Sequence, residues 1–255
     1  MTPPAIVKMA VERGLDMIAI CDHNSAGNTA AVQEAAAGAL AVLAGIEITT
    51  VEEAHVVGLF PSAQAAEAAG AQILDLLPKV EHQYTSFFGE QWLLTADGTR
   101  IGDERRALAL ATPLPLRAAV DLIRQHGGLA IAAHVDRRSF GVIAQLGFFP
   151  SEAGFDAIDV SRHVADDAPL LDELTQHGLP ITASSDSHYL ADLGTATTTL
   201  TVAAPTFAEL RMAFVGRDGR RAQRTPKACR GDNAGASARP SRNDPLDRLQ
   251  GGRHA

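Results

Sequence analysis

The chain has 255 residues, an apolar fraction of 46% and a net charge of −8, which suits one α/β barrel or two small domains with an ordinary apolar core. No apolar run reaches the roughly 18 residues that a membrane-spanning helix needs, and the N-terminus lacks the basic-then-apolar order of a secretory signal. Two cysteines make no disulfide framework, so we expect a cytoplasmic protein with no membrane partner.

Short apolar runs alternate with helical segments along the chain. The predicted helices are 3–13, 29–38, 63–77, 116–126, 139–146, 168–177 and 207–214, and the predicted strands are 17–21, 41–49, 55–60, 129–133, 157–161 and 180–184. Strands that alternate with helices at this spacing predict a parallel sheet covered by helices. An open sheet and a closed barrel both fit the pattern.

Residues 80–112 break this alternation. The run WLLTADGTRIG within them is typical of a β-hairpin, with Asp97 and Gly98 at the turn. We interpret the whole segment as an excursion from the main domain that could serve as a lid.

The charge is unevenly distributed. Residues 216–255 hold ten Arg or Lys against four Asp or Glu, an excess of six positive charges that leaves −14 on residues 1–215. An acidic body argues against a non-specific nucleic-acid groove and is compatible with a site for divalent cations. Because residues 216–255 have no apolar periodicity and are rich in Arg, Gly, Asn, Pro and Ser, we predict a disordered basic tail.

Side chains that bind metals follow or end several of the predicted strands. They are Asp22, His23, Glu47, His134, Asp186 and His188. In parallel α/β folds the carboxyl ends of the strands share one face, and that face holds the active site. His55 begins its strand, so it joins this group only if that strand is oriented or bent to reach the same rim.

Imidazole and carboxylate groups are ligands for Zn, Mn or Fe, and a carboxylate such as Glu47 or Asp186 can bridge two ions. Two-metal sites of this kind suit phosphoester hydrolysis. Taken singly, a His after a strand is more often structural and an Asp there is a helix N-cap, but the joint pattern favours a metal site. Arg137 and Arg162 lie near the same rim and suit phosphate binding, with a surface salt bridge as the equal alternative for each.

Five motifs in combination resemble the PHP family, named for polymerase and histidinol phosphatase. They are AICDHN (19–24), GIEIT (45–49), HVVGLF (55–60), AHVDR (133–137) and SSDSH (184–188). They run in the family's order from residue 2 to about residue 215, and the excursion resembles a bacterial subgroup of stand-alone metal-dependent phosphoesterases. The resemblance implies an α/β fold over residues 1–215, a distorted (β/α)7 TIM-like barrel with a site at the carboxyl ends of the strands.

The resemblance also implies a site for up to three divalent ions, Mn, Zn or Fe. Glu47 would bridge two of them. His55 and His134 would bind one of these two ions, and Asp186 would bind the other.

The remaining assignments concern the third ion and the substrate. His23 and His188 would help to hold the third ion, and Asp22 would be an additional ligand or a partner of the ligands. A metal-bound hydroxide would be the nucleophile, with Arg137 and Arg162 as phosphate contacts.

The sequence departs from the PHP pattern at its start. PHP proteins begin with a strand that carries His-x-His, whereas this sequence holds no His-x-His and begins just before the Thr-Pro that usually follows that strand. The first barrel strand and two or three ligands are therefore missing. We expect Met1 to be an internal methionine of a longer reading frame; the alternative is a true short form with an open barrel edge, which is an aggregation liability.

The leading hypothesis is a metal-dependent phosphoesterase that acts on a nucleotide, a sugar phosphate or the end of an oligonucleotide. The alternative is a degenerate, non-catalytic PHP domain with a binding or regulatory role, which the missing His-x-His motivates. A nuclease or proofreading module attached to a polymerase is disfavoured, because the chain has no room for a polymerase and its body is acidic. The sequence leaves the substrate, the metal and the oligomeric state open.

Overall fold

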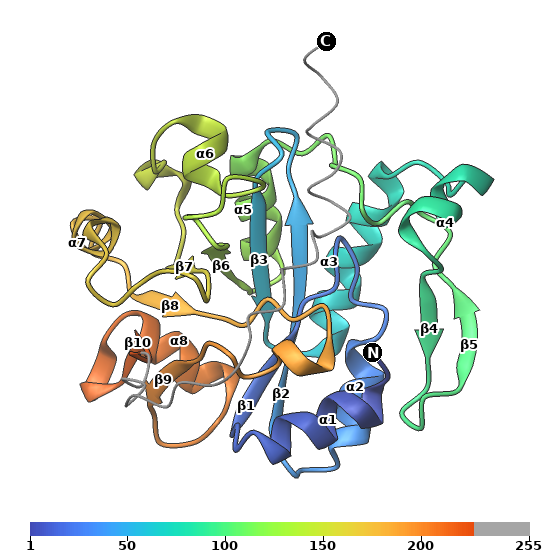
Figure 1. The fold of residues 1–255 in the computed structure, drawn as a ribbon, viewed down its shortest axis with the longest axis horizontal. Coiled ribbons are helices and arrows are strands. Elements are labelled where there is room, and N and C mark those ends of the chain that lie inside the picture. Colours follow the sequence, from blue (N-terminus) through green and yellow to red (C-terminus); the bar gives the residue numbers. More distant parts are fainter. Residues whose placement is uncertain (227–255) are drawn as a thin grey trace, which may run out of the picture.

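The structure, a computed structural model, describes residues 1–226 (Figure 1). Its helices are α1 (Pro3–Glu12), α2 (Thr29–Ala36), α3 (Ala63–Leu76), α4 (His82–Phe88), α5 (Leu116–Gln125), α6 (Val142–Leu146), α7 (Pro169–Thr175) and α8 (Phe207–Phe214), with 3-10 turns η1 (Ser151–Ala153), η2 (Leu190–Asp192) and η3 (Arg217–Gly219). Its strands are β1 (Met17–Ile20), β2 (Ala41–Thr49), β3 (His55–Phe60), β4 (Trp92–Leu94), β5 (Arg100–Asp103), β6 (Leu129–Ala132), β7 (Ala157–Val160), β8 (Ile181–Ala183), β9 (Thr198–Thr201) and β10 (Arg221–Arg224). Within residues 1–226, no helix has the length and apolar character to cross a bilayer.

Six strands form one sheet in the order β1-β2-β3-β6-β7-β8. The parallel pairing that the sequence predicts is found between β1 and β2 and among β6, β7 and β8, but β3 is antiparallel to both of its neighbours. The prediction is wrong for β3 because residues 50–54 are too few for the crossover that a parallel pair requires. As a result the start of β3 lies beside the end of β2, with Thr49 opposite His55.

The sheet curls without closing. Its edge strands are β1 and β8, and no strand within residues 1–226 pairs with both of them. The expectation of a (β/α)7 barrel that lacks its first strand is met in part, because the sheet of the described residues is an open, six-stranded half-barrel. Closure would require a strand hydrogen-bonded to each edge, and the six strands do not complete the ring.

The two faces of the sheet have different coverings. On the outer face, residues such as Ile46 and Val56 pack with α3 and α5, and α1 and α2 cover β1. On the inner face, Leu59 and Ile131 pack against Phe214 of α8. The inner face thus has an apolar base filled by α8 (Figure 1, lower left), which leaves the carboxyl rim for polar side chains.

The predicted hairpin is confirmed. Strands β4 and β5 pair antiparallel, and the turn between them has Gly98 at φ 87° with its N–H donated to the carbonyl of Thr95. The hairpin stands to one side of the central sheet beside α4 (Figure 1, right). Asn28 ties it to the domain, accepting from the N–H of Leu94 and donating to the carbonyl of Trp92, both at 3.0 Å.

Residues 217–224, which the sequence assigned to the tail, form η3 and β10. Strand β10 pairs antiparallel with β9, and Ala222 is buried in the same cluster as α8. The sequence concealed this strand because Ala222 is its one buried apolar residue and arginines flank it. Residues 227–255, including Cys229, lie outside the described residues, so the disordered tail stays a prediction for them.

Two glycines give a matched test of this packing. A methyl group added at Gly58 of β3 would lie 2.8 Å from Cγ1 of Ile123, whereas at Gly70 of α3 the nearest atom is Cδ1 of Ile46 at 3.4 Å. We expect Gly58→Ala to lower the free energy of unfolding by about 1–3 kcal/mol through overpacking. We expect Gly70→Ala to raise it by about 0.5–1 kcal/mol, because alanine is the better helix former. Urea unfolding measures both values, and a Gly58→Ala protein as stable as the wild type would contradict the packing.

Candidate metal centre

Four predicted ligands meet on the inner face at the carboxyl rim. Glu47 lies near the end of β2, and His55 faces it because β3 is antiparallel to β2. His134 follows β6, the other neighbour of β3. His23 extends the β1–β2 pairing through an isolated parallel bridge to Glu47. The condition attached to His55 from the sequence is therefore met.

Three of these side chains have the spacing of metal ligands. Oε1 of Glu47 lies 3.3 Å from Nδ1 of His55 and 3.3 Å from Nε2 of His134, and the two ring nitrogens are 3.2 Å apart. Ligands placed about 2.0–2.1 Å from a tetrahedral ion are roughly 3.3–3.4 Å from one another. These three atoms, which we call the ligand triangle, therefore fit one face of a tetrahedral site.

The second oxygen of Glu47 faces another imidazole. Oε2 lies 3.0 Å from Nδ1 of His23, and atoms of His23, Glu47 and His55 all lie within 4.8 Å of one another. The carboxylate thus divides its two oxygens between two sets of histidines.

The cluster is buried, and burial shifts the pKa values of its members. The exposed fractions are 6% for Glu47, 3% for His55 and 2% for His134. Burial raises the pKa of Glu47, but the surrounding histidines outweigh it and hold this pKa well below its usual value. Burial lowers the pKa of His55. Burial also acts to lower the pKa of His134, but the attraction of Glu47 outweighs burial and raises this pKa. Glu47 is therefore an ionised carboxylate, available to a cation.

The far sides of two histidine rings lack polar partners. Nε2 of His55 and Nδ1 of His134 are buried without a hydrogen bond in the described structure, a condition that costs about 1–3 kcal/mol for each buried polar group. His55 is oriented instead by Phe140. The two rings stack with their centroids 4.5 Å apart and an interplanar angle of 17°, and the main-chain N–H of His55 donates to the carbonyl of Phe140 at 2.9 Å. Phe140 is not among the residues predicted from the sequence, and no metal-ligand pattern would indicate it.

Backbone strain gathers around the cluster. Four of the non-glycine residues with positive φ are Asn24 (52°), His134 (29°), Phe140 (61°) and Asp186 (45°). Such conformations cost on the order of 1–3 kcal/mol each and persist only where their surroundings hold them, which is common at functional sites.

Asn24 shows how one of these strained residues is held. Its Nδ2 donates to the carbonyls of Leu108 and Leu110 at 2.8 and 3.0 Å, and its Oδ1 accepts from the N–H of Thr49 at 3.0 Å. Its main-chain N–H also donates to the carbonyl of Glu47 at 2.8 Å. Asn24 therefore fixes the loop after β1 against the strand that carries Glu47.

Asp186, His188 and Arg137 form a second, more exposed group at the same rim. Nη1 of Arg137 lies 2.5 Å from Oδ2 of Asp186, and Nδ1 of His188 lies 3.8 Å from Oδ1 of Asp186. The ring of His188 is 5.7 Å from that of His23, centroid to centroid. The structure thus places these three predicted residues beside the ligand triangle and not in it.

Asp22 and Arg162 have other partners. The group of ligand atoms around Glu47 does not include Asp22, whose pKa is raised by burial and lowered in part by the side chain of Asn28. The main-chain carbonyl of Asp22 accepts from the N–H of Glu47 at 3.1 Å. Nη1 of Arg162 lies 2.8 Å from Asp192, the salt bridge that the sequence leaves as its alternative role.

Asp159 is a buried carboxylate that the sequence did not single out. It lies on the inner face of β7 and accepts from the hydroxyls of Thr182 (2.9 Å) and Ser184 (2.8 Å). Burial raises its pKa to about 6, although both hydroxyls lower it. Its main-chain carbonyl accepts from the N–H of Val135, next to His134. In the sequence, its single carboxylate within the otherwise apolar run AIDV could have indicated this buried position.

The C-terminal part of the domain matches a known family model. Residues 172–217 match the family model described as PHP-associated. The resemblance to the PHP family is confirmed. The PHP-associated segment contains β8, the Asp186 and His188 group, and α8, so it supplies one side of the rim and the helix at the base of the half-barrel.

The fold is also similar to solved structures. The endonuclease PfuEndoQ from Pyrococcus furiosus matches with a TM-score of 0.66 at 16% identity, over 87% of this chain and 53% of that chain. A complex of Endonuclease Q with a 27-mer duplex substrate, which has an abasic lesion at the active site, gives the same values. A "putative metal-dependent phosphoesterase" from Bifidobacterium adolescentis matches with a TM-score of 0.54 at 22% identity, over 82% of this chain and 89% of that chain.

These identities show a shared fold alone. The chain spans about half the length of the two endonuclease chains that it matches. Among curated proteins, no sequence matches the chain significantly.

The buried carboxylate of Asp159 predicts a pH dependence of stability. Because its pKa is raised from 3.8 to about 6 on folding, the ionised form is disfavoured in the folded state. The folded protein therefore loses stability as the pH rises through this interval, by roughly 1–2 kcal/mol between about pH 5 and about pH 8. Asp159→Asn lacks this loss, so urea unfolding of the metal-stripped proteins should favour the variant increasingly as the pH rises. A stability difference that stays constant with pH would contradict the assignment.

Proposed function

We propose that the chain is a metal-dependent phosphoesterase that hydrolyses a small phosphoester, such as a nucleotide, a sugar phosphate or the end of an oligonucleotide. The observation that carries the proposal is the ligand triangle of Glu47, His55 and His134, whose edges of 3.2–3.3 Å fit a tetrahedral cation. The fold shared with a phosphoesterase and two endonuclease structures supports the same class of chemistry.

The donor set fits a divalent ion such as Zn, Mn or Fe. Bound there, the ion would supply Lewis-acid activation of water and of the phosphate. Glu47 would hold ions through both oxygens, and the neutral imidazoles of His55 and His134 would leave most of the positive charge free to attract a phosphate. His23 and His188 would serve further ions on the Oε2 side of Glu47.

Arg137 would act on the substrate. Its guanidinium lies at the rim, against Asp186, and presents a planar set of donors that matches two phosphate oxygens. Asp186 would keep the guanidinium of Arg137 at the rim. Once Arg137 turns to the phosphate, Asp186 would itself be able to join the ligands. Arg162 would help to bind the phosphate only after its pair with Asp192 opens.

Metal binding should stabilise the folded protein. At a Zn or Mn concentration about 100 times Kd, binding to the folded state alone contributes about 2.7 kcal/mol. For a domain of this size that corresponds to a rise in Tm of roughly 5–10 °C, measured by differential scanning fluorimetry. His134→Ala should abolish the rise, whereas His177→Ala, an exposed histidine bonded to Ser151, should retain it. A wild-type protein that shows no rise with either metal would rule out the site.

Catalysis should depend on the same residues. We expect metal-dependent phosphate release from an aryl phosphate, with His55→Ala and His134→Ala lowering kcat/KM by about 100-fold or more. Arg137→Gln should raise KM more than it lowers kcat, because it contacts the phosphate and not the metal. A nucleoside monophosphate, a sugar phosphate and a duplex with an abasic site would then rank the substrate classes. Full activity in both histidine variants would exclude this site.

A non-catalytic binding role is the second candidate. It is favoured by the pair between Asp186 and Arg137, which leaves a predicted ligand neutralised outside the triangle. Metal analysis of the purified protein separates the two: less than about one tightly bound ion per chain favours the binding role, because a multi-metal site needs its full ligand set. Two or more ions per chain favour the hydrolase.

A further inference from the structure

A pocket lies at the end of the half-barrel opposite the candidate metal centre. It has a volume of about 450 Å³, and its floor is Leu129 at the start of β6, the strand whose other end leads to His134. Asp156 lies on one wall, just before β7, and α8 forms another. No residue of the pocket belongs to the ligand triangle or to the Asp186 group, so the two sites are separate.

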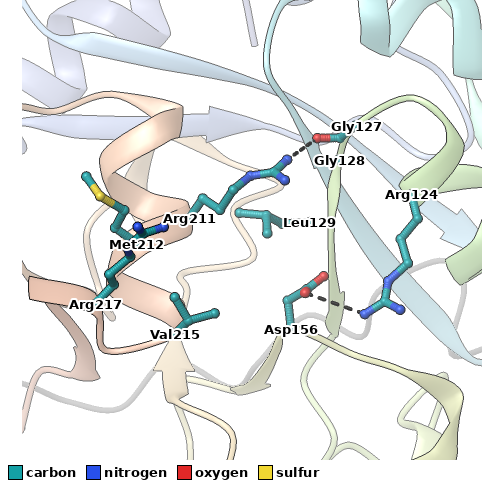
Figure 2. Close-up of a pocket in the computed structure, with 9 residues that line it drawn as sticks. All are labelled: Arg124, Gly127, Gly128, Leu129, Asp156, Arg211, Met212, Val215 and Arg217. Atoms are coloured by element: carbon teal, nitrogen blue, oxygen red, sulfur yellow. Dashed lines mark hydrogen bonds and ion pairs between the residues drawn. The ribbon is translucent and has the colours of Figure 1, made fainter.

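Three arginines from three elements line this pocket. They are Arg124 at the end of α5, Arg211 in α8 and Arg217 in η3 (Figure 2). Among residues 1–226, Asp156 is the one acidic residue in the lining, so these walls carry an excess of two positive charges. The body of the protein is acidic overall, with −14 over residues 1–215. A cationic hollow on such a body concentrates small anions.

Two of the three guanidinium groups have partners at the pocket, one through a hydrogen bond and one through an ion pair. Arg211 donates to the carbonyl of Gly127 and lies 5.2 Å from the ring centroid of Phe207. Nη2 of Arg124 lies 3.6 Å from Oδ1 of Asp156, whose Oδ2 accepts from the N–H of Ala130 at 2.7 Å. Figure 2 shows Arg211 beside Leu129, and Arg124 pointing toward Asp156. Each of these two contacts involves one nitrogen of its guanidinium, and the other donors remain available to a ligand.

Arg217 is the adaptable member. Its side chain is 72% exposed, and its contact with Asp218 at 3.7 Å is a surface pair of little energetic weight. It can therefore turn toward the pocket when an anion is present. Met212 and Val215 add apolar surface next to Leu129, which would accommodate the non-phosphate part of a ligand.

We propose that this pocket binds a phosphate-bearing small molecule, a phosphate monoester or a diphosphate, as a ligand distinct from the substrate of the metal centre. The volume lies in the range of small-ligand sites. Arginine forks pair with two phosphate oxygens at once, and three such groups set against one carboxylate match a group that carries two negative charges. The pocket does not depend on the proposed hydrolase activity.

Pyrophosphate titrated calorimetrically into the full chain, stripped of metal with a chelator, tests the proposal. We expect one binding site with Kd below about 1 mM, weakened at least about tenfold in Arg124→Gln/Arg211→Gln. Asp156→Asn should bind several-fold more tightly, because it removes the one negative charge from the walls while retaining an acceptor for Ala130. A damaged fold would not produce this gain.

Two controls locate the binding. Arg117→Gln removes an exposed arginine that is paired with Asp121 outside the pocket, and it should leave Kd unchanged. His134→Ala should also leave Kd unchanged, so that binding at the metal centre is recognised if it occurs. Arg217→Gln, which removes an exposed side chain, should weaken binding by a few fold without a change in Tm.

Several outcomes would overturn the proposal. They are the absence of pyrophosphate binding below about 1 mM, equal weakening in Arg117→Gln, loss of binding in His134→Ala, and an unchanged or weaker affinity in Asp156→Asn. A single-stranded oligonucleotide added in place of pyrophosphate separates free phosphates from a nucleic-acid backbone. Binding of the oligonucleotide alone, lost in the double arginine variant, would reject the small-molecule site in favour of a nucleic-acid contact.

Discussion

The buried carboxylate of Glu47 is the interaction on which the rest of the rim depends. An ionised group with 6% exposure is tolerated only if nearby groups replace the water that it loses. Here the replacement comes from imidazoles on three other chain segments: His23 after β1, His55 at the start of β3 and His134 after β6. The charge therefore fixes the relative positions of four neighbouring strands, and the same geometry presents two carboxylate oxygens and three nitrogens to a cation. The arrangement that offsets the buried charge is therefore also the one that we propose to hold a cation.

The sequence predicted much of this rim because the ends of parallel strands converge. Glu47 and His134 follow apolar runs, and their meeting required only that β2 and β6 point the same way. His55 could not be placed from the pattern, since its strand is reversed between two parallel pairs. The reversal is a consequence of a five-residue connection, residues 50–54, which the alternation of helix and strand did not weigh. The ladder β9–β10 escaped prediction for a related reason, because one buried alanine among arginines carries too little apolar pattern.

Other parts of the site depend on tertiary contacts that no local pattern records. Phe140 orients His55 by stacking from a distant loop, and Asn24 connects the loop after β1 to residues 108–110 through its side-chain amide. Asp159 joins the segment after β6 to the segment after β8, since its carbonyl accepts from Val135 and its carboxylate accepts from Ser184. These residues position the segments that carry the predicted ligands, and no spacing in the sequence marks them. For Asp22 and Arg162, which also fit a spacing, the contacts are with other side chains: Asn28 lowers the pKa of Asp22, and Arg162 pairs with Asp192.

The open half-barrel is closed in part by side chains where no strand pairing exists. On one side of the gap, Leu193 beyond η2 packs with Val7 and Ala10 of α1. On the other, the hydroxyl of Thr198 donates to the carbonyl of Ala183 at 2.9 Å and accepts from its N–H at 3.0 Å, which satisfies part of the free edge of β8. The PHP-associated segment contains Leu193, Thr198 and Ala183, so it bridges the gap as well as filling the base. The two sides then meet at the rim, where the rings of His23 and His188 lie 5.7 Å apart. The position of His188, and with it any shared ion, is therefore set by packing across the gap and not by a continuous sheet.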